Sequence, residues 1–92
     1  MFNFYYKTND YKALELVVGK VLIYTSYLTP IAIFDPELAK LIIIDEKISV
    51  TTSRHRNAIY SRYSWLDESD LNKVTKEEFD SLYKKLFGDI QL

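Results

Sequence analysis

The sequence is poor in the residues that build metal sites, disulfides and flexible segments. Its 92 residues include no cysteine, one histidine, two glycines and two prolines. The absence of cysteine excludes a disulfide framework, a thiolate nucleophile and every cysteine-based zinc or iron–sulfur site. With His55 as the one histidine, we expect no transition metal and no cofactor. A hydrophobic fraction of 48% with so few glycines and prolines is typical of an ordered globule.

Long apolar runs are also missing. No stretch approaches the roughly 20 apolar residues that a membrane-spanning helix needs. The opening residues MFNFYYKTND lack the basic start and the continuous apolar stretch of a secretory signal. We therefore expect a cytoplasmic protein of a bacterial host cell, without membrane contact. We also expect a single domain, residues 1–92, which is too small to enclose a large cofactor cavity because it buries only about 60–65% of its unfolded surface.

Charge is nearly balanced overall but unevenly distributed. The formal net charge of −1 gives no general attraction to nucleic acid. Residues 48–66 contain three arginines and no acidic residue, whereas residues 67–80 contain six acidic residues against Lys73 and Lys76. Two interpretations are open: two solvated faces of opposite charge, or a basic docking surface for phosphates or for an acidic partner.

Residues 13–50 predict an antiparallel β-meander of three to four strands. The segments KVLIYTSYL (20–28), PIAIFD (30–35) and AKLIIID (39–45) are rich in β-branched and aromatic residues and are separated by turn-forming residues. KISV (47–50) is expected to end the meander. Residues 9–18 are ambiguous, because Tyr11, Leu14 and Val17 have helical spacing while LELVVGKVLI reads as two strands joined near Gly19. We favour a strand from about Ala13.

Two C-terminal helices, at about 53–66 and 76–87, are expected to pack on this sheet in an α+β fold. Thr75 and Glu78 form a capping box for the second helix, and Gly88 stands where a terminating glycine is common. Its apolar residues form one continuous stripe that predicts a core-facing surface. The first helix is expected to begin with Thr51, Thr52 or Ser53 as its N-cap.

The stretch SVTTSRHRNAIYSRYSW (49–65) contains the histidine, all three arginines and the one tryptophan. At 100° per residue, a helix places His55 at the edge of a core face formed with Ile59, Tyr63 and Leu66. Arg54, Arg62 and Trp65 follow one flank of that face. Arg56 points to the other side.

Two alternatives remain open within this stretch. His55 is either a half-buried structural residue bonded to the sheet or to a threonine hydroxyl, or a group that transfers protons or contacts a partner. A histidine-based phosphodiesterase-like site would need a second acid–base group from elsewhere in the fold. Likewise, the hydroxyls at residues 51–53 either cap the helix or form an anion pocket with Arg54 and Arg56.

Residues 20–66 resemble a small domain of unknown function that occurs widely in phage and prophage proteins. The signature is a Tyr-Ser-Tyr-like strand, a Thr-Pro-Ile-Ala strand, and a Ser-x-Thr-Thr-Ser-Arg-His-x-Asn run. The matching residues are Tyr24, Ser26, Tyr27, Thr29, Pro30, Ile31, Ala32, Ser49, Thr51, Thr52, Ser53, Arg54, His55, Asn57 and Ile59. The sequence departs from the pattern at Ile48, where tyrosine is usual, and in its longer C-terminal extension. The resemblance implies a phage or mobile-element origin, and no established activity.

Small phage accessory proteins commonly bind host proteins or nucleic acid, so the resemblance implies a binding role. We expect a non-enzymatic, anti-CRISPR-like protein that binds and inhibits a host defence complex, either a protein or a protein–nucleic acid complex. The alternatives are a nucleic-acid-binding accessory or regulatory module with phosphate contacts, and a small nuclease-like enzyme. The expected partner-binding residues are Arg54, Arg62, Trp65, Arg56, Thr51, Thr52, Ser53 and His55.

Overall fold

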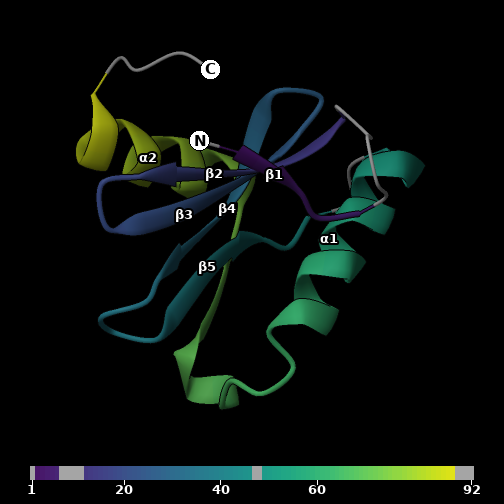
Figure 1. Cartoon of the computed structure of the whole chain (residues 1–92). Helices are drawn as coiled ribbons and strands as arrows, with labels where there is room; N and C mark the ends of the chain where they lie inside the picture. Colours follow the sequence, from purple (N-terminus) through teal and green to yellow (C-terminus); the bar gives the residue numbers. More distant parts are fainter. Residues whose placement is uncertain (1, 7–11, 47–48, 89–92) are drawn as a thin grey trace.

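A computed structural model describes residues 2–6, 12–46 and 49–88 (Figure 1). In chain order its elements are β1 (Phe2–Phe4), β2 (Ala13–Val18), β3 (Val21–Ser26), β4 (Thr29–Asp35), β5 (Lys40–Ile44), α1 (Val50–Arg62), the short 3-10 helix η1 (Glu68–Asp70), β6 (Leu71–Val74) and α2 (Lys76–Phe87). The strands of this described part form one sheet in the order β1-β2-β3-β4-β5-β6. The α+β class is therefore confirmed.

The expectation of three to four antiparallel strands was wrong, because the described residues form six. The additional strands are β1 and β6, of three and four residues, which are too short for a clear alternating pattern. The first five strands pair antiparallel, but β6 pairs parallel to β5. A parallel neighbour requires a crossover connection. Here α1 lies in that connection, so its place beside the sheet follows from the topology.

The element boundaries differ from the expected ones mainly around α1. The meander begins at Ala13 as expected, but β5 ends at Ile44 and not near residue 50. Helix α1 spans Val50–Arg62 and not 53–66, because Ser49 is the N-cap and its Oγ accepts a hydrogen bond from the Thr52 amide at 3.1 Å. The expected caps at 51–53 thus lie within the first turn. Residues 9–11 and 47–48 lie outside the described residues.

Helix α2 has the ends that its sequence indicates. The capping box is present, with the Glu78 amide donating to Thr75 Oγ1 at 3.1 Å and the Thr75 amide donating to the Glu78 carboxylate at 3.2 Å. Gly88 follows the helix with φ of 66°, in the left-handed region that favours glycine.

Both faces of the sheet are covered. Residues 31–34 of β4 are all buried, and consecutive strand residues point to opposite faces. One face packs on α1, since the Tyr63 ring lies 5.8 Å from that of Tyr24 and 4.4 Å from that of Phe34. Helix α2 lies on the other side, and its Phe79 is fully buried (Figure 1). The sheet and the two helices on its faces position the polar groups at both ends of α1.

Candidate functional site

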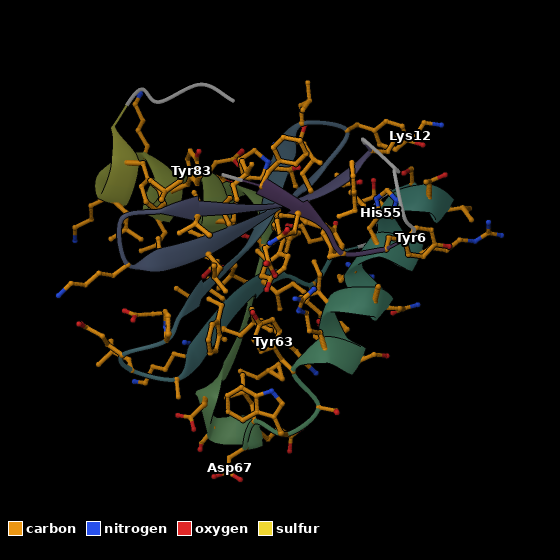
Figure 2. The ribbon with its side chains drawn as sticks, in the orientation of Figure 1. Tyr6, Lys12, His55, Tyr63, Asp67 and Tyr83 are labelled. Carbon is orange, nitrogen blue, oxygen red and sulfur yellow. The ribbon has the colours of Figure 1, made fainter. Side chains whose placement is uncertain are left out.

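Helix α1 carries polar clusters at both of its ends. Figure 2 shows His55 and Tyr6 near the start of α1, and Tyr63 and Asp67 at its far end. The His55 cluster is His55 with the hydroxyls of Ser26, Thr52 and Ser49. The Glu15 network is Glu15, Tyr24, Tyr63 and Arg62. The Trp65 surface is Trp65 with the acidic residues Asp67, Glu68 and Asp70.

The His55 cluster joins α1 to the end of β3. His55 is fully buried, and its Nδ1 lies 2.7 Å from Ser26 Oγ. Ser26 Oγ lies 3.0 Å from Thr52 Oγ1, which accepts a hydrogen bond from Ser49 Oγ at 3.0 Å. Ser49, Thr52, Ser26 and His55 are thus joined in one chain of hydrogen bonds, in which either hydroxyl of the Ser26–Thr52 pair can be the donor and the role of Nδ1 follows the tautomer of the ring.

Aromatic rings surround the imidazole. The rings of Tyr6, Tyr27 and Tyr5 have their centres 4.9, 6.0 and 6.1 Å from that of His55. His55 was expected at the edge of the core face, half-buried; the structure places it fully inside, because the N-terminal tyrosines cover the side that the helix leaves open. A bond to the sheet is therefore present. The proton-transfer role stays a prediction.

The Glu15 network is a site that the sequence interpretation missed. Glu15 in β2 is only 5% exposed, accepts a hydrogen bond from the Tyr24 hydroxyl at 2.7 Å, and pairs with Arg62 Nη2 at 3.2 Å. The Tyr24 and Tyr63 hydroxyls also bond to each other. A glutamate in the middle of the apolar run LELVV was the signal, because a carboxylate inside a buried strand needs a partner.

The two phenols of the Glu15 network stay protonated at neutral pH. Burial raises the pKa of Tyr24, and its bonds to Tyr63 and Glu15 raise it further. Burial also raises the pKa of Tyr63. The network therefore contains one negative and one positive group, Glu15 and Arg62, joined by neutral hydroxyls. It neutralises the charge of Arg62 and fixes the C-terminal end of α1 against β2 and β3.

Trp65 lies beyond the helix and not on its flank. Helix α1 ends at Arg62 with Tyr63 as its C-cap, so the helical phase that was expected to align Trp65 with Arg54 and Arg62 stops before residue 65. The Trp65 ring is held at 6.1 Å from the Phe34 ring and 6.2 Å from the Tyr63 ring. The residue is nevertheless 64% exposed. Trp65 is thus an exposed aromatic side chain that packs against the buried rings of Phe34 and Tyr63.

The three arginines do not form one surface. Arg54 is exposed on α1. Arg56 donates from Nη1 to the carbonyl of Ile44 at 3.3 Å and to that of Glu46, so it holds the end of β5 and not an anion beside residues 51–53. Arg62 is tied to Glu15. Thr52 is buried, whereas Thr51 and Ser53 are half-buried. The structure thus places His55 and Thr52 in the first half of α1, Arg62 at its last residue and Trp65 beyond its end.

Among residues 2–6, 12–46 and 49–88, no group of three or more histidine, cysteine, aspartate or glutamate side chains is placed to hold a metal ion. Within the same residues, no helix is long and apolar enough to cross a membrane.

The comparisons with known proteins place the chain in a family. No curated protein and no solved structure matches it. One family model does, over residues 2–81, which include every strand, α1 and the first half of α2. The coarse part of the expected resemblance, a domain of unknown function, is therefore confirmed. The chain belongs to the family of unknown function DUF8033.

Proposed function

We propose that this protein is a non-enzymatic binding module that recognises a protein partner through the Trp65 surface. The observation that carries the proposal is the state of Trp65. Its indole is 64% exposed, yet it rests on the buried rings of Phe34 and Tyr63. A tryptophan that is already oriented loses little conformational freedom on binding and buries a large apolar area, which is why tryptophan is enriched among the residues that dominate interface energies.

The surroundings of Trp65 indicate the charge of the partner. The Arg62 charge is compensated by Glu15, whereas Asp67 and Glu68 are exposed and Asp70 is half-buried. The segment that follows Trp65 in the chain is therefore acidic. Electrostatic complementarity favours a partner with basic groups around an apolar pocket. A basic docking surface was one of the two interpretations of the sequence; the proposal favours acidic contacts instead, because Arg56 and Arg62 are bonded within the fold.

The proposed partner is a host defence complex in the cytoplasm of a bacterial cell. The resemblance of residues 20–66 to a phage and prophage domain supports an origin in a mobile element and an anti-CRISPR-like role. A defence complex that handles nucleic acid presents basic surfaces for phosphates. An acidic module that covers such a surface inhibits the complex by occupying it, and no catalytic step is needed.

A nucleic-acid-binding module is the weaker alternative. Such a module would need several arginines or lysines directed at phosphates. Here Arg56 is bonded to backbone carbonyls and Arg62 to a buried carboxylate. The acidic residues after α1 would also repel the phosphates.

The proposal is tested with Trp65→Ala and the matched control Val50→Ala. Val50 is 72% exposed at the opposite end of α1, so its substitution also removes an exposed apolar side chain. We expect wild type and Val50→Ala to capture the same protein from host lysate, with and without nuclease treatment. With that partner purified, Trp65→Ala should bind at least about 30-fold more weakly. Equal binding by Trp65→Ala, or capture that nuclease abolishes, would contradict the proposal.

A further inference from the structure

A second feature lies at the other end of α1, away from the Trp65 surface. A cavity of about 240 Å³ opens between the first turns of the two helices. Its apolar lining comes from Ile31 of β4 and Ile44 of β5, which are both nearly fully buried. Its polar lining includes Ser26 and Thr52 of the His55 cluster, 3% and 7% exposed, and Lys76 at the start of α2. Five elements therefore meet around one small space.

The volume sets the size of a ligand. It is about eight times the ~30 Å³ that one water molecule occupies in the liquid, and it is below the range of ~300–1,000 Å³ typical of drug-sized ligands. The cavity accordingly suits a molecule of roughly eight to ten non-hydrogen atoms. The two isoleucine side chains favour an apolar body, because polar groups placed against them would lose hydration without compensation.

The electrostatics set the sign of its charge. The N-terminal ends of α1 and α2 both lie at the cavity, and a helix N-terminus carries a partial positive charge. Lys76 adds an ammonium group. Its Nζ pairs with Asp80 at 2.8 Å, but both side chains are more than half exposed, and an exposed i,i+4 pair contributes little. The ammonium can therefore exchange Asp80 for a ligand at small cost. The carboxylate of Glu46, which accepts from the Lys76 amide at 2.6 Å, opposes an anion and keeps the affinity moderate.

The His55 cluster supplies a hydrogen-bond donor. The Thr52 hydroxyl accepts a hydrogen bond from Ser49 Oγ, and its oxygen lies 3.0 Å from Ser26 Oγ. A hydroxyl rotates freely about its C–O bond, so Thr52 can donate to an acceptor in the cavity. Ser49 still donates to Thr52, and Ser26 stays bonded to His55. One bond is exchanged for another, and no buried group loses its only partner.

We propose that this cavity binds a small free monocarboxylate with an apolar tail. One carboxylate oxygen accepts from the Thr52 hydroxyl, the other contacts the Lys76 ammonium, and the tail lies against Ile31 and Ile44. The site is independent of the Trp65 surface, since it uses the first turn of α1 while Trp65 lies beyond the last one. Failure of one proposal therefore leaves the other unaffected.

The probe is hexanoate, with hexanamide as the uncharged molecule of the same length and hexylamine as the cationic one. Backbone amide chemical shifts of the ¹⁵N-labelled full chain report binding. We expect hexanoate to shift the amides of Ile31, Ile44 and Thr52 in a saturable way, with an affinity at least about threefold higher than that of hexanamide. Lys76→Met should lower the hexanoate affinity to that of hexanamide. Lys84→Met, in the last turn of the same helix, should leave it unchanged.

Three results would overturn the proposal. The first is the absence of saturable shifts at the cavity residues with hexanoate. The second is equal or tighter binding of hexanamide or hexylamine, which would refute the assigned charge. The third is an equal loss of affinity in Lys76→Met and Lys84→Met, which would reduce the effect to general surface charge. Lys76 is on the surface, so both variants are expected to fold, and their thermal unfolding serves as the check.

Discussion

Substitution of Arg62 is the first prediction, because its position in the sequence and its contacts in the structure predict different effects on stability. By sequence Arg62 is an exposed helix arginine, whose substitution usually changes stability by less than about 0.5 kcal/mol. In the structure it pairs with the buried Glu15 carboxylate at 3.2 Å. Arg62→Met keeps the aliphatic stem and removes the charge. Glu15 then keeps only the Tyr24 hydroxyl, at 2.7 Å, among the partners that this network gives it.

The expected magnitude follows from the burial of the two partners. Breaking a fully buried ion pair costs about 3–5 kcal/mol, because one charge stays buried without compensation. Glu15 is 6% exposed in its side chain but Arg62 is 46% exposed, so water can replace part of the lost interaction. We therefore expect Arg62→Met to lower the free energy of unfolding by about 2 kcal/mol. In a domain of this size, that corresponds to a decrease in Tm of about 8–16 °C.

The assay is urea unfolding followed by circular dichroism at neutral pH, with Arg54→Met as the matched control. Arg54 is exposed on the same helix, and its variant should unfold like wild type. Glu15→Gln should partly rescue Arg62→Met, because it removes the uncompensated charge while the Gln side chain still accepts from Tyr24. If Arg62→Met is as stable as Arg54→Met, the Glu15 network does not fix the end of α1 and the reasoning is refuted.

Two further predictions concern His55 and the tyrosines. His55→Ala should destabilise the fold by about 2–4 kcal/mol, because it leaves a cavity and removes one of the two side-chain partners of Ser26. Binding of a partner at Trp65 should be unchanged. An unchanged melting midpoint together with lost binding would assign His55 a functional role instead. Burial, assisted by the bond to Asp45, raises the pKa of Tyr60 to about 12. Since this pKa lies above the unfolded value of about 10, the stability that the protonated Tyr60 contributes is complete below pH 10 and is lost as the pH rises towards 12. In an ultraviolet titration of tyrosinate, Tyr60 should ionise at lower pH in Asp45→Asn than in wild type. Equal stability of the wild type at pH 9 and 11.5 would contradict the assignment.

Local signals were sufficient for some elements of the fold. Helix α2 could be predicted because its capping box, its apolar stripe and the following glycine all act within a few residues of one another. The hairpins from β2 to β5 could be predicted because turn-forming residues separate β-branched runs. The expected start of α1 was wrong, because Ser49, and not Thr51, Thr52 or Ser53, is the N-cap. Ser49 serves as the cap because it is its Oγ that accepts from the Thr52 amide.

Contacts between distant parts of the chain decided the formation of β6, the position of Trp65 and the partners of the arginines. Strand β6 has only four residues, LNKV, and its extended form depends on pairing with β5. The phase of Trp65 was wrong because the helix stops at Arg62, where the Tyr63 ring packs against Phe34. The expected docking surface on α1 treated the arginines as unpaired, whereas Arg62 pairs with Glu15 of β2 and Arg56 donates to the Ile44 carbonyl of β5. Nothing near Arg62 in the sequence indicates Glu15.

The sequence by itself determined the α+β class, the antiparallel strands from β2 to β5, α2 and the inward face of α1, because hydrophobic periodicity and capping are properties of neighbouring residues. Tertiary structure alone decided which polar groups meet. It joined Glu15 to Arg62, connected Ser26, Thr52 and His55, left Trp65 exposed on a buried aromatic base, and opened a cavity between two helix ends. These contacts link strands and helices that are far apart in the chain. Their energies depend on burial, and burial exists only after the sheet has formed between α1 and α2.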